Sequence, residues 1–355
     1  MASFAKEIAA LDLAELVPGT CAAGTPSETR IAARLHAACT THGFFYLANH
    51  GVSLDLIAEM FQCSRRFFRL TAKQKRTVLA VKSRGYTPLA EETLDPERQS
   101  CGDTKEGFYI GNKEAGEVDA SAAIGPNRWP DEGKLPQLVG WRDTMRAYFQ
   151  SVHLLGMRLL RLLALSLNLP ADYFTPKFSD PMEALRLLHY SEQKSDAGAG
   201  ILGCGAHSDY GALTFLLTDD VPGLEILRNG CSLGTARNED WMAIAPRANC
   251  FIVNLGDMLA RWTNDVYSST VHRVVNRSGR ERFSVPFFFE PNFDTEVSCL
   301  DGFGPAKYAA TTSGEYLLGK YSETHAMFEE GGGGEWEERD SGAGREDGGC
   351  SRESN

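Results

Sequence analysis

The pattern of apolar and polar positions changes near residue 180, and the two parts of the chain predict different kinds of structure. In the first part, residues 28–41 repeat an apolar side chain at every fourth position, which is the spacing of one helix face. Similar patterns predict further elements, namely a strand within 43–52 and helices over about 53–70 and 137–169. We therefore expect a mixed helix and strand region in this part.

From residue 184 onward, short β-branched or aromatic runs recur, and turn residues separate them. The runs are ALRLLHY, ALTFLLT, GLEILR, WMAIAP, CFIVNL, VHRVVN and RFSVPFFFE. Seven such runs predict an antiparallel sandwich or barrel rather than alternating βαβ units. Two short helices are also expected in this part, over 257–263 and 313–324.

Composition and charge exclude two classes of protein. The 355 residues carry 36 Lys and Arg against 47 Asp and Glu, a net charge of −11, whereas phosphate recognition leaves a basic footprint. No apolar run approaches the roughly 18–20 residues that span a bilayer, and acidic residues interrupt the N-terminal stretch where a secretory signal would be apolar. Nine cysteines without a Cys-x-x-Cys pair suit reduced thiols. We expect a soluble cytoplasmic enzyme with no nucleic-acid or membrane partner; the sequence does not indicate its oligomeric state.

The acidity is concentrated at the C-terminal end of the chain. Residues 329–355 hold 3 Arg against 9 Asp and Glu, so −6 of the net charge lies in 27 residues that also contain eight glycines. Such a segment buries almost no apolar surface, so we expect it to be disordered. The chain therefore divides into an N-terminal region over 1–175, a barrel over 176–328 and this tail.

Three side chains indicate a metal centre. His207 and Asp209 lie two residues apart at the predicted start of one strand, so they project from the same face, and His272 opens a later strand. Two imidazoles and one carboxylate on one face of an octahedron hold non-haem Fe(II) and leave positions open for O2 and a chelating cosubstrate. A lone His-x-Asp pattern is a weak signal, because it also occurs in unrelated loops.

A second polar pair lies ten residues beyond His272. Arg282 and Ser284 share one strand face within an otherwise apolar run. Burying an unpaired guanidinium is very costly, so an inward Arg282 needs an anion, either a bound carboxylate or an internal Asp or Glu. The presence of the metal ligands together with this pair favours the bound carboxylate.

Several longer segments surround these residues. They are HSDYGALTFLLTDDVPGLEIL, NLGDMLARWTNDVYSSTVHRVVN and RERFSVPFFFEPN, with GFFYLANHGVS, FFRLTAKQK and RGYTPL nearer the N-terminus. Together they resemble the iron(II)/2-oxoglutarate-dependent oxygenases, and more narrowly the isopenicillin-N-synthase-like branch, over about residues 8–328. The resemblance implies a mainly β fold with flanking helices, in which a double-stranded β-helix core of the jelly-roll or cupin type is joined to an N-terminal α/β cap.

The resemblance also implies what the candidate residues do. The implied ligands of Fe(II) are His207, Asp209 and His272, and those of the distal carboxylate of 2-oxoglutarate are Arg282 and Ser284. Tyr190 corresponds to a tyrosine that helps to hold the cosubstrate in plant members, although Leu188 and Ser191 replace the asparagine and proline expected beside it. The implied reaction uses O2 to hydroxylate or desaturate a small organic molecule, with release of succinate and CO2.

Strand parity extends the site towards the substrate. If the Arg-x-Ser pair faces inward, Phe288 and Glu290 face inward too, and the resemblance matches them with positions that touch substrate in flavonoid-oxidising relatives. For Phe288, ordinary core packing is an equally good explanation. Phe108, in KEGFYIG, is a candidate for the lip of the cavity by resemblance alone. Parity turns Cys204 away from His207, as a core thiol.

Two other functions stay open at this point. One is an Fe(II) oxidase of the same fold that does not use 2-oxoglutarate, as in isopenicillin N synthase or the ethylene-forming plant oxidase, because the Arg-x-Ser pair survives in such enzymes. The other is an inactive barrel that only binds a ligand, although such a protein has no physical need for three converging metal ligands. The sequence does not identify the substrate.

Overall fold

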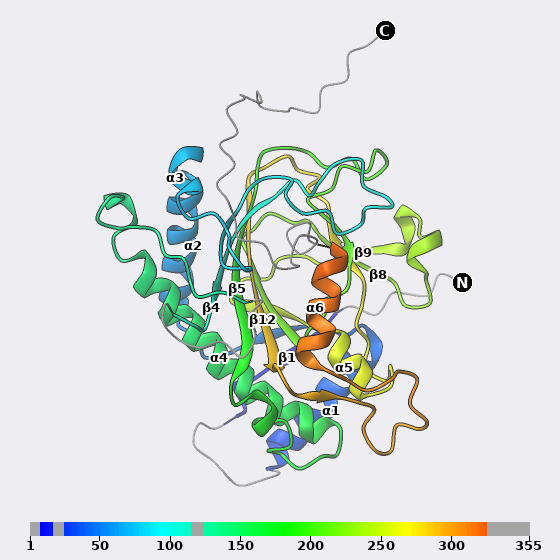
Figure 1. Cartoon of the computed structure of the whole chain (residues 1–355). Helices are drawn as coiled ribbons and strands as arrows, with labels where there is room; N and C mark the ends of the chain where they lie inside the picture. The colour runs from blue at the N-terminus through cyan, green and yellow to red at the C-terminus, as the bar shows by residue number, and fades with distance from the viewer. Residues whose placement is uncertain (1–7, 17–24, 115–123, 325–355) are drawn as a thin grey trace.

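The computed structural model describes residues 8–16, 25–114 and 124–324. The architecture is mainly β, with helices on the outside, as the sequence predicts (Figure 1). Two facing sheets make up the core. The acidic tail over 329–355, which we expected to be disordered, lies outside the described residues.

The larger sheet has eight strands in the order β1-β2-β10-β7-β12-β5-β4-β3. Its neighbouring strands are antiparallel, except that β1 and β2 run parallel. The strands are β1 (Ala9–Asp12), β2 (Phe44–Ala48), β3 (Gly85–Thr87), β4 (Glu106–Gly111), β5 (Pro181–Tyr190), β7 (Leu213–Thr218), β10 (Cys250–Leu255) and β12 (Arg282–Asn292). The N-terminal region therefore adds strands to both edges of this sheet.

The smaller sheet has four antiparallel strands in the order β6-β11-β8-β9. The strands are β6 (Cys204–His207), β8 (Leu224–Leu227), β9 (Trp241–Ala243) and β11 (His272–Val274). Ile226 of β8 shares one apolar cluster with Tyr46 of β2 and Ile252 of β10, so the two sheets face each other. A separate pair consists of β13 (Glu296–Val297) and β14 (Thr311–Thr312).

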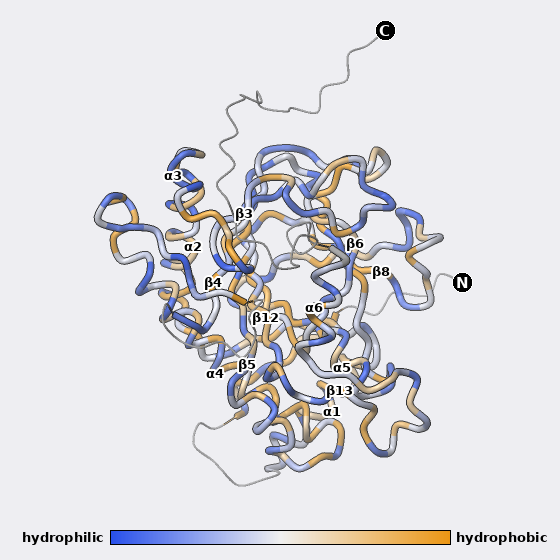
Figure 2. The backbone as a smooth tube through the Cα atoms, in the orientation of Figure 1, coloured by the Kyte–Doolittle hydropathy of each residue, from blue (hydrophilic) through white to orange (hydrophobic). Residues whose placement is uncertain are grey.

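Helices cover the outer face of the larger sheet. The long α4 (Trp141–Ser166) packs against α1 (Pro26–Thr41) and α2 (Leu54–Phe68) and contacts β12. Gly156 on α4 permits this close approach, because a Cβ atom there would lie 2.8 Å from the ring of Phe289. The other helices are α3 (Ala72–Arg76), α5 (Asp257–Trp262) and α6 (Ser313–Thr324), with 3-10 turns at Pro136–Leu138, Thr175–Phe178, Leu233–Thr235 and Asn238–Asp240. Apolar positions follow the central strands, while the outer loops are mostly hydrophilic (Figure 2).

The predicted elements correspond to observed ones. All seven runs after residue 184 contain strands, and the helix predicted over 313–324 is found at these residues. The helix predicted over 137–169 begins at Trp141, because Gly140 before it adopts a left-handed backbone with φ 78°. No helix among the described residues is long and apolar enough to cross a membrane.

Candidate metal centre

Three potential metal ligands line one cavity between the two sheets. His207 is the last residue of β6, and β6 places it directly opposite His272, the first residue of β11. The Asp209 Oδ1 atom lies 3.7 Å from His207 Nε2 and 3.6 Å from His272 Nε2. All three ligand atoms lie within 4.8 Å of one another, so the side chains could hold one metal ion.

The position of Asp209 differs from the expectation. We expected His207 and Asp209 to begin one strand and to share its face, but β6 ends at His207 and Asp209 follows in a turn. This turn is fixed by its neighbours, since the Asp209 carbonyl oxygen accepts a 2.8 Å hydrogen bond from the N–H of Asp257. The ligands therefore converge through a fixed turn and not through strand parity.

Hydrogen bonds to the main chain orient both imidazoles. His207 Nδ1 lies 2.8 Å from the carbonyl oxygen of Gly205, and His272 Nδ1 lies 3.1 Å from that of Thr270. A carbonyl oxygen only accepts, so each Nδ1 carries the proton and each Nε2 has a free lone pair for a metal. Burial and the neighbouring His207 lower the pKa of His272 to about 4, so this ring is neutral at neutral pH.

Asp209 is held with one charged oxygen available. Its Oδ2 atom accepts hydrogen bonds from the Thr214 hydroxyl at 2.5 Å and the Asn254 amide at 2.7 Å. Burial alone would raise the pKa of Asp209, but the two imidazoles and these hydrogen bonds outweigh it and lower the pKa. Sequence reasoning missed Thr214 and Asn254, although each is a polar residue within an apolar run, and they are cross-strand partners on β7 and β10.

Arg282 lies in the same cavity as the three ligands and has an unused donor. Its side chain is buried; Nε donates to the Val221 carbonyl oxygen at 3.2 Å, while Nη1 has no hydrogen-bond partner. The guanidinium also lies over the ring of Tyr190, 4.8 Å from its centroid. Within the part of the chain that the structure describes, no carboxylate forms an ion pair with Arg282, although Asp219 lies near enough for the guanidinium to oppose the rise in its pKa that burial causes.

The other residues of β12 alternate between two faces. The cavity-lining residues of this strand are Arg282, Ser284, Pro286 and Phe288. Phe287 and Phe289 are fully buried on the opposite face, where Phe287 packs edge-on against Phe149 of α4. Tyr190 also lines the cavity and lies opposite Arg282 in the β5–β12 register. The structure therefore brings Tyr190 and the Arg-x-Ser pair together beside the potential metal ligands.

Two protein-family profiles match the chain. Residues 8–132 match the profile for "non-haem dioxygenase in morphine synthesis N-terminal", and residues 181–291 match the "2OG-Fe(II) oxygenase superfamily". The 2-oxoglutarate-Fe(II) type oxidoreductase hxnY of Emericella nidulans is 32% identical over 315 residues, which cover 85% of this chain and 87% of that protein. The chain belongs to the 2OG-Fe(II) oxygenase superfamily. The 2-oxoglutarate-dependent dioxygenase citB of Monascus ruber is 37% identical over 278 residues, 76% of this chain and 81% of that one.

Solved structures resemble this oxygenase over most of its length. A full-length Neurospora crassa protein solved in complex with alpha-KG has a TM-score of 0.76 and 28% identity, over 89% of this chain and 96% of that one. JOX2 in complex with 2OG, Fe and JA has a TM-score of 0.70 and 27% identity, over 88% and 84%. The expected double-stranded β-helix core and the expected branch of the family are confirmed.

A second cavity of the oxygenase adjoins the first one and shares five lining residues with it, namely Leu94, Arg186, His207, Asp209 and Phe288. Glu290 lines this second cavity, so both residues that parity turned inward reach it. Burial raises the pKa of Glu290 to about 8. The positive charge of Arg84 opposes this rise, and the negative charge of Asp209 adds to it. The carboxyl is therefore mostly protonated at neutral pH and can donate a hydrogen bond. The other polar and aromatic residues around this cavity include Glu92, Tyr109, Arg186, Tyr210 and Tyr321.

Two further cations line these cavities, Arg186 both of them and Lys105 the first, and unlike Arg282 both are paired. Arg186 Nη2 donates to Glu92 Oε1 at 2.5 Å, and its guanidinium lies 4.2 Å from the ring centroid of Tyr109. The buried Lys105 pairs with Glu92 at 3.1 Å and with Asp103. Sequence reasoning missed this set, although Arg186 is a charged residue inside the apolar run ALRLLHY.

The expectation for Phe108 was wrong. Its side chain is fully buried and packs edge-on against Phe67 at 4.7 Å and Trp141 at 5.2 Å, between β4 and the helices. Adjacent residues of a strand point to opposite faces, so it is Tyr109 that lines the cavity. The segment was correctly placed near the cavity, but the wrong face of β4 was chosen.

Cys204 also departs from strand parity. It lines the same cavity as the metal ligands, because the pairing of β6 with β11 shifts register between His272 and Val274. Burial raises the pKa of its thiol to about 12, and it packs with Leu188 and Tyr190. It is a neutral core thiol, as expected, but on the inner face.

Proposed function

We propose that this oxygenase binds its metal and cosubstrate through six residues: His207, Asp209 and His272 for Fe(II), and Arg282, Ser284 and Tyr190 for 2-oxoglutarate. The observation that supports this assignment is the buried Arg282 Nη1 atom, which has no partner in a cavity that the three potential ligands also line. A buried guanidinium without an anion is costly, and a dicarboxylate cosubstrate supplies one. The Ser284 hydroxyl lies on the same face of β12.

Bound Fe(II) supplies the redox chemistry by which O2 converts 2-oxoglutarate to succinate and CO2 while one position of the substrate is oxidised. The imidazoles of His207 and His272 and the single available oxygen of Asp209 would supply three ligand atoms to such an ion. Thr214 and Asn254 keep the second oxygen of Asp209 occupied, so that this carboxylate offers one atom. Apolar side chains of Phe44, Leu216 and Leu224 line the same cavity and exclude water.

The substrate that we propose is a small organic molecule with a flat ring and polar substituents, bound in the second cavity. Phe288 offers a ring face, and the protonated Glu290 offers a donor for a carbonyl or hydroxyl oxygen. The Neurospora crassa protein has been solved with thymine, and JOX2 with JA, so relatives of similar fold bind small molecules. Hydroxylation and desaturation both agree with this arrangement.

We further propose that residues 1–175 and 176–328 form one catalytic unit in the cytoplasm. Strands of the first segment continue both edges of the larger sheet, so a boundary there does not separate two cores. The seven cysteines within the described residues are all free thiols, in keeping with a reducing compartment.

The alternative of an oxidase that dispenses with 2-oxoglutarate is not favoured. The named relatives are 2-oxoglutarate-dependent enzymes, and the Neurospora crassa protein and JOX2 have been solved with this cosubstrate. A barrel that only binds a ligand is also disfavoured, because three converging potential ligands with matched outer hydrogen bonds serve no purpose without a metal.

Two measurements on the purified chain test this function. Anaerobic addition of Fe(II) and 2-oxoglutarate should produce a visible charge-transfer band that neither component gives alone. O2-dependent succinate release should then increase when the correct small molecule is added from a panel of planar oxygenated compounds. Substrate oxidation that needs no 2-oxoglutarate and releases no succinate would support the oxidase instead.

A further inference from the structure

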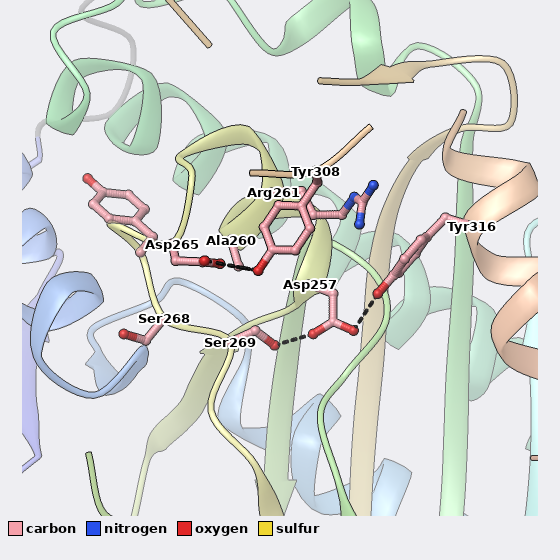
Figure 3. Close-up of a pocket in the computed structure, with 9 residues that line it drawn as sticks. Asp257, Ala260, Arg261, Asp265, Ser268, Ser269, Tyr308 and Tyr316 are labelled. Atoms are coloured by element: carbon pink, nitrogen blue, oxygen red, sulfur yellow. Dashed lines mark hydrogen bonds between the residues drawn. The ribbon is translucent and has the colours of Figure 1, made fainter. Parts of the chain in front are cut away.

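Asp257 lies close behind the potential metal ligands, although it does not line their cavity. It is the first residue of α5 and faces a separate cleft at the surface (Figure 3). Its backbone N–H donates to the carbonyl oxygen of Asp209 at 2.8 Å. The start of α5 is pressed against this turn, since a Cβ atom at Gly256 would lie 2.9 Å from the same carbonyl oxygen.

The Asp257 carboxylate joins three segments that are distant in the sequence. Its Oδ1 atom accepts a hydrogen bond from Ser269 at 2.6 Å, and its Oδ2 atom accepts one from Tyr316 of α6 at 2.8 Å (Figure 3). Ser208 also donates to Oδ2, at 3.3 Å. Ser208 lies between His207 and Asp209, and Ser269 lies three residues before His272.

Few backbone hydrogen bonds join the two segments that hold the ligands. β6 has four residues and β11 has three, and their pairing is interrupted between His272 and Val274. Beyond the ends of these strands the turn at Asp209 and the segment before His272 are no longer paired with each other. The Asp257 side chain bridges these two segments at this point, through Ser208 and Ser269.

We propose that Asp257 is a positioning residue for the metal centre. Its carboxylate holds Ser208 and Ser269 at a fixed separation, and thereby holds the Asp209 turn at the distance from His272 that one ion requires. This role rests on the proposed metal site, but Asp257 itself contacts neither metal nor substrate. The simpler alternative is that Asp257 only anchors α6 to the barrel through Tyr316.

The test compares two aspartates of the same cleft. Asp257→Asn keeps the size of the side chain but replaces one acceptor oxygen by an NH2 group, so the hydroxyls that donate to that oxygen lose their acceptor. Asp265→Asn is the matched control, because Asp265 accepts hydrogen bonds from Tyr308 and Lys307 and touches neither ligand-bearing segment. Fe(II) affinity is measured anaerobically with 2-oxoglutarate, and the melting temperature is measured on the metal-free proteins.

We expect Asp257→Asn to weaken Fe(II) binding about 10-fold, at the lower end of the effects of outer hydrogen-bond partners, and Asp265→Asn to leave it unchanged. Equal Fe(II) affinity in wild type and Asp257→Asn would overturn the positioning role, as would an equal loss in both variants. If the wild-type protein itself binds no Fe(II), the proposed function fails, which is a different result.

Two milder variants keep the test decisive if Asp257→Asn does not fold. Ser269→Ala removes only the contact to the His272 segment and should weaken Fe(II) binding with little change in melting temperature. Tyr316→Phe removes only the contact to α6 and should lower the melting temperature with little change in Fe(II) affinity. The reverse pattern would mean that Asp257 serves to anchor α6.

Discussion

β12 runs along both cavities, with Arg282 at the end that lines the first cavity and Glu290 at the end that lines the second. These two ends are built differently. At one end Arg282 is buried with an unused Nη1 donor and no ion-pair partner among the described residues. At the other end Glu290 is mostly protonated at neutral pH, and the nearby Arg186 is already paired with Glu92. The first end therefore requires an anion, whereas the second is close to neutral.

This difference matches the two tasks of such an oxygenase. The proposed cosubstrate is a dicarboxylate, so a single buried charge on the central strand β12 suffices to bind its distal carboxylate. The proposed substrate cavity is lined by β4, β5, β12, α6, the segment before β4 and residues 207–210. Changes in β4, α6 or the segment before β4 can alter this cavity without changing β12, which carries Arg282.

The largest effect should come from Asp209→Ala, because Asp209 lines both cavities and its loss removes the centre that they share. We expect Fe(II) affinity to fall by more than ~100-fold, beyond the effect of an outer hydrogen-bond partner, and succinate release to disappear. Anaerobic Fe(II) titration and a succinate assay measure the two results. The exposed Asp220→Asn is the control. Retention of both iron binding and turnover in Asp209→Ala would disprove the metal site.

Arg282→Met should have a smaller effect, which is limited to the binding of 2-oxoglutarate. Loss of the charge-assisted bonds to the cosubstrate carboxylate should raise the dissociation constant for 2-oxoglutarate by about 10–100-fold, while Fe(II) binding alone is kept. The metal-free variant should melt no lower than wild type, because a buried cation without an anion is removed. Titration of the charge-transfer band with 2-oxoglutarate measures this loss.

Arg280→Met is the matched control for that variant, since Arg280 is exposed and pairs with Asp220 near the start of the same strand. Unchanged 2-oxoglutarate affinity in Arg282→Met would show that another group binds the cosubstrate. A large fall in melting temperature would instead mean that the guanidinium stabilises the metal-free fold.

The sequence could predict those parts of the site in which local geometry decides where a side chain points. Arg282, Ser284, Phe288 and Glu290 lie on one regular strand, where a period of two determines the face of each residue. Seven apolar runs separated by turn residues predicted an antiparallel sandwich or barrel from local patterns alone. The double-stranded β-helix core was implied by the resemblance to the oxygenases.

The remaining features depend on contacts between distant segments. The shifted register of β6 and β11 turned Cys204 inward, and no local pattern reveals such a shift. For Phe108 the apolar run fits either face of β4, so only the packing of α2 and α4 decides its direction. Arg186 and Lys105 are buried because both pair with Glu92, which lies in another segment, and Lys105 also pairs with the nearby Asp103; a single sequence does not show the contacts to Glu92.

Glu290→Gln should affect the substrate end alone and in a pH-dependent way. The pKa of Glu290 is raised by burial from 4.5 to about 8, so below pH 4.5 both folded and unfolded states are protonated. Between pH 4.5 and 8 the unfolded state releases the proton and the folded state keeps it, so stability falls by roughly 1.4 kcal/mol per pH unit from this group. Above that range both states are ionised and the loss levels off.

The glutamine variant lacks this titration, so its melting temperature relative to wild type should rise as the pH increases from 4.5 to 8. Melting curves of the metal-free proteins across that range measure the difference, and 2-oxoglutarate affinity should stay unchanged. Glu281→Gln is the control, because Glu281 is about half exposed and bonds His189 at the start of β12. Parallel pH profiles for Glu290→Gln and wild type would mean that Glu290 is ionised in the folded protein.

The smallest effects should separate the two faces of β4. Tyr109→Phe removes one hydroxyl from the substrate cavity, so we expect a change of about 5-fold or less in the substrate KM and almost no change in melting temperature. Phe108→Leu should do the opposite, with a loss of about 1 kcal/mol in stability and an unchanged KM, because Phe108 packs only against the helical layer. Measuring KM and melting temperature for both variants compares adjacent residues on a single strand. If Phe108→Leu changed KM more than Tyr109→Phe, the substrate would reach through β4 towards the helices, and the second cavity would not be its binding site.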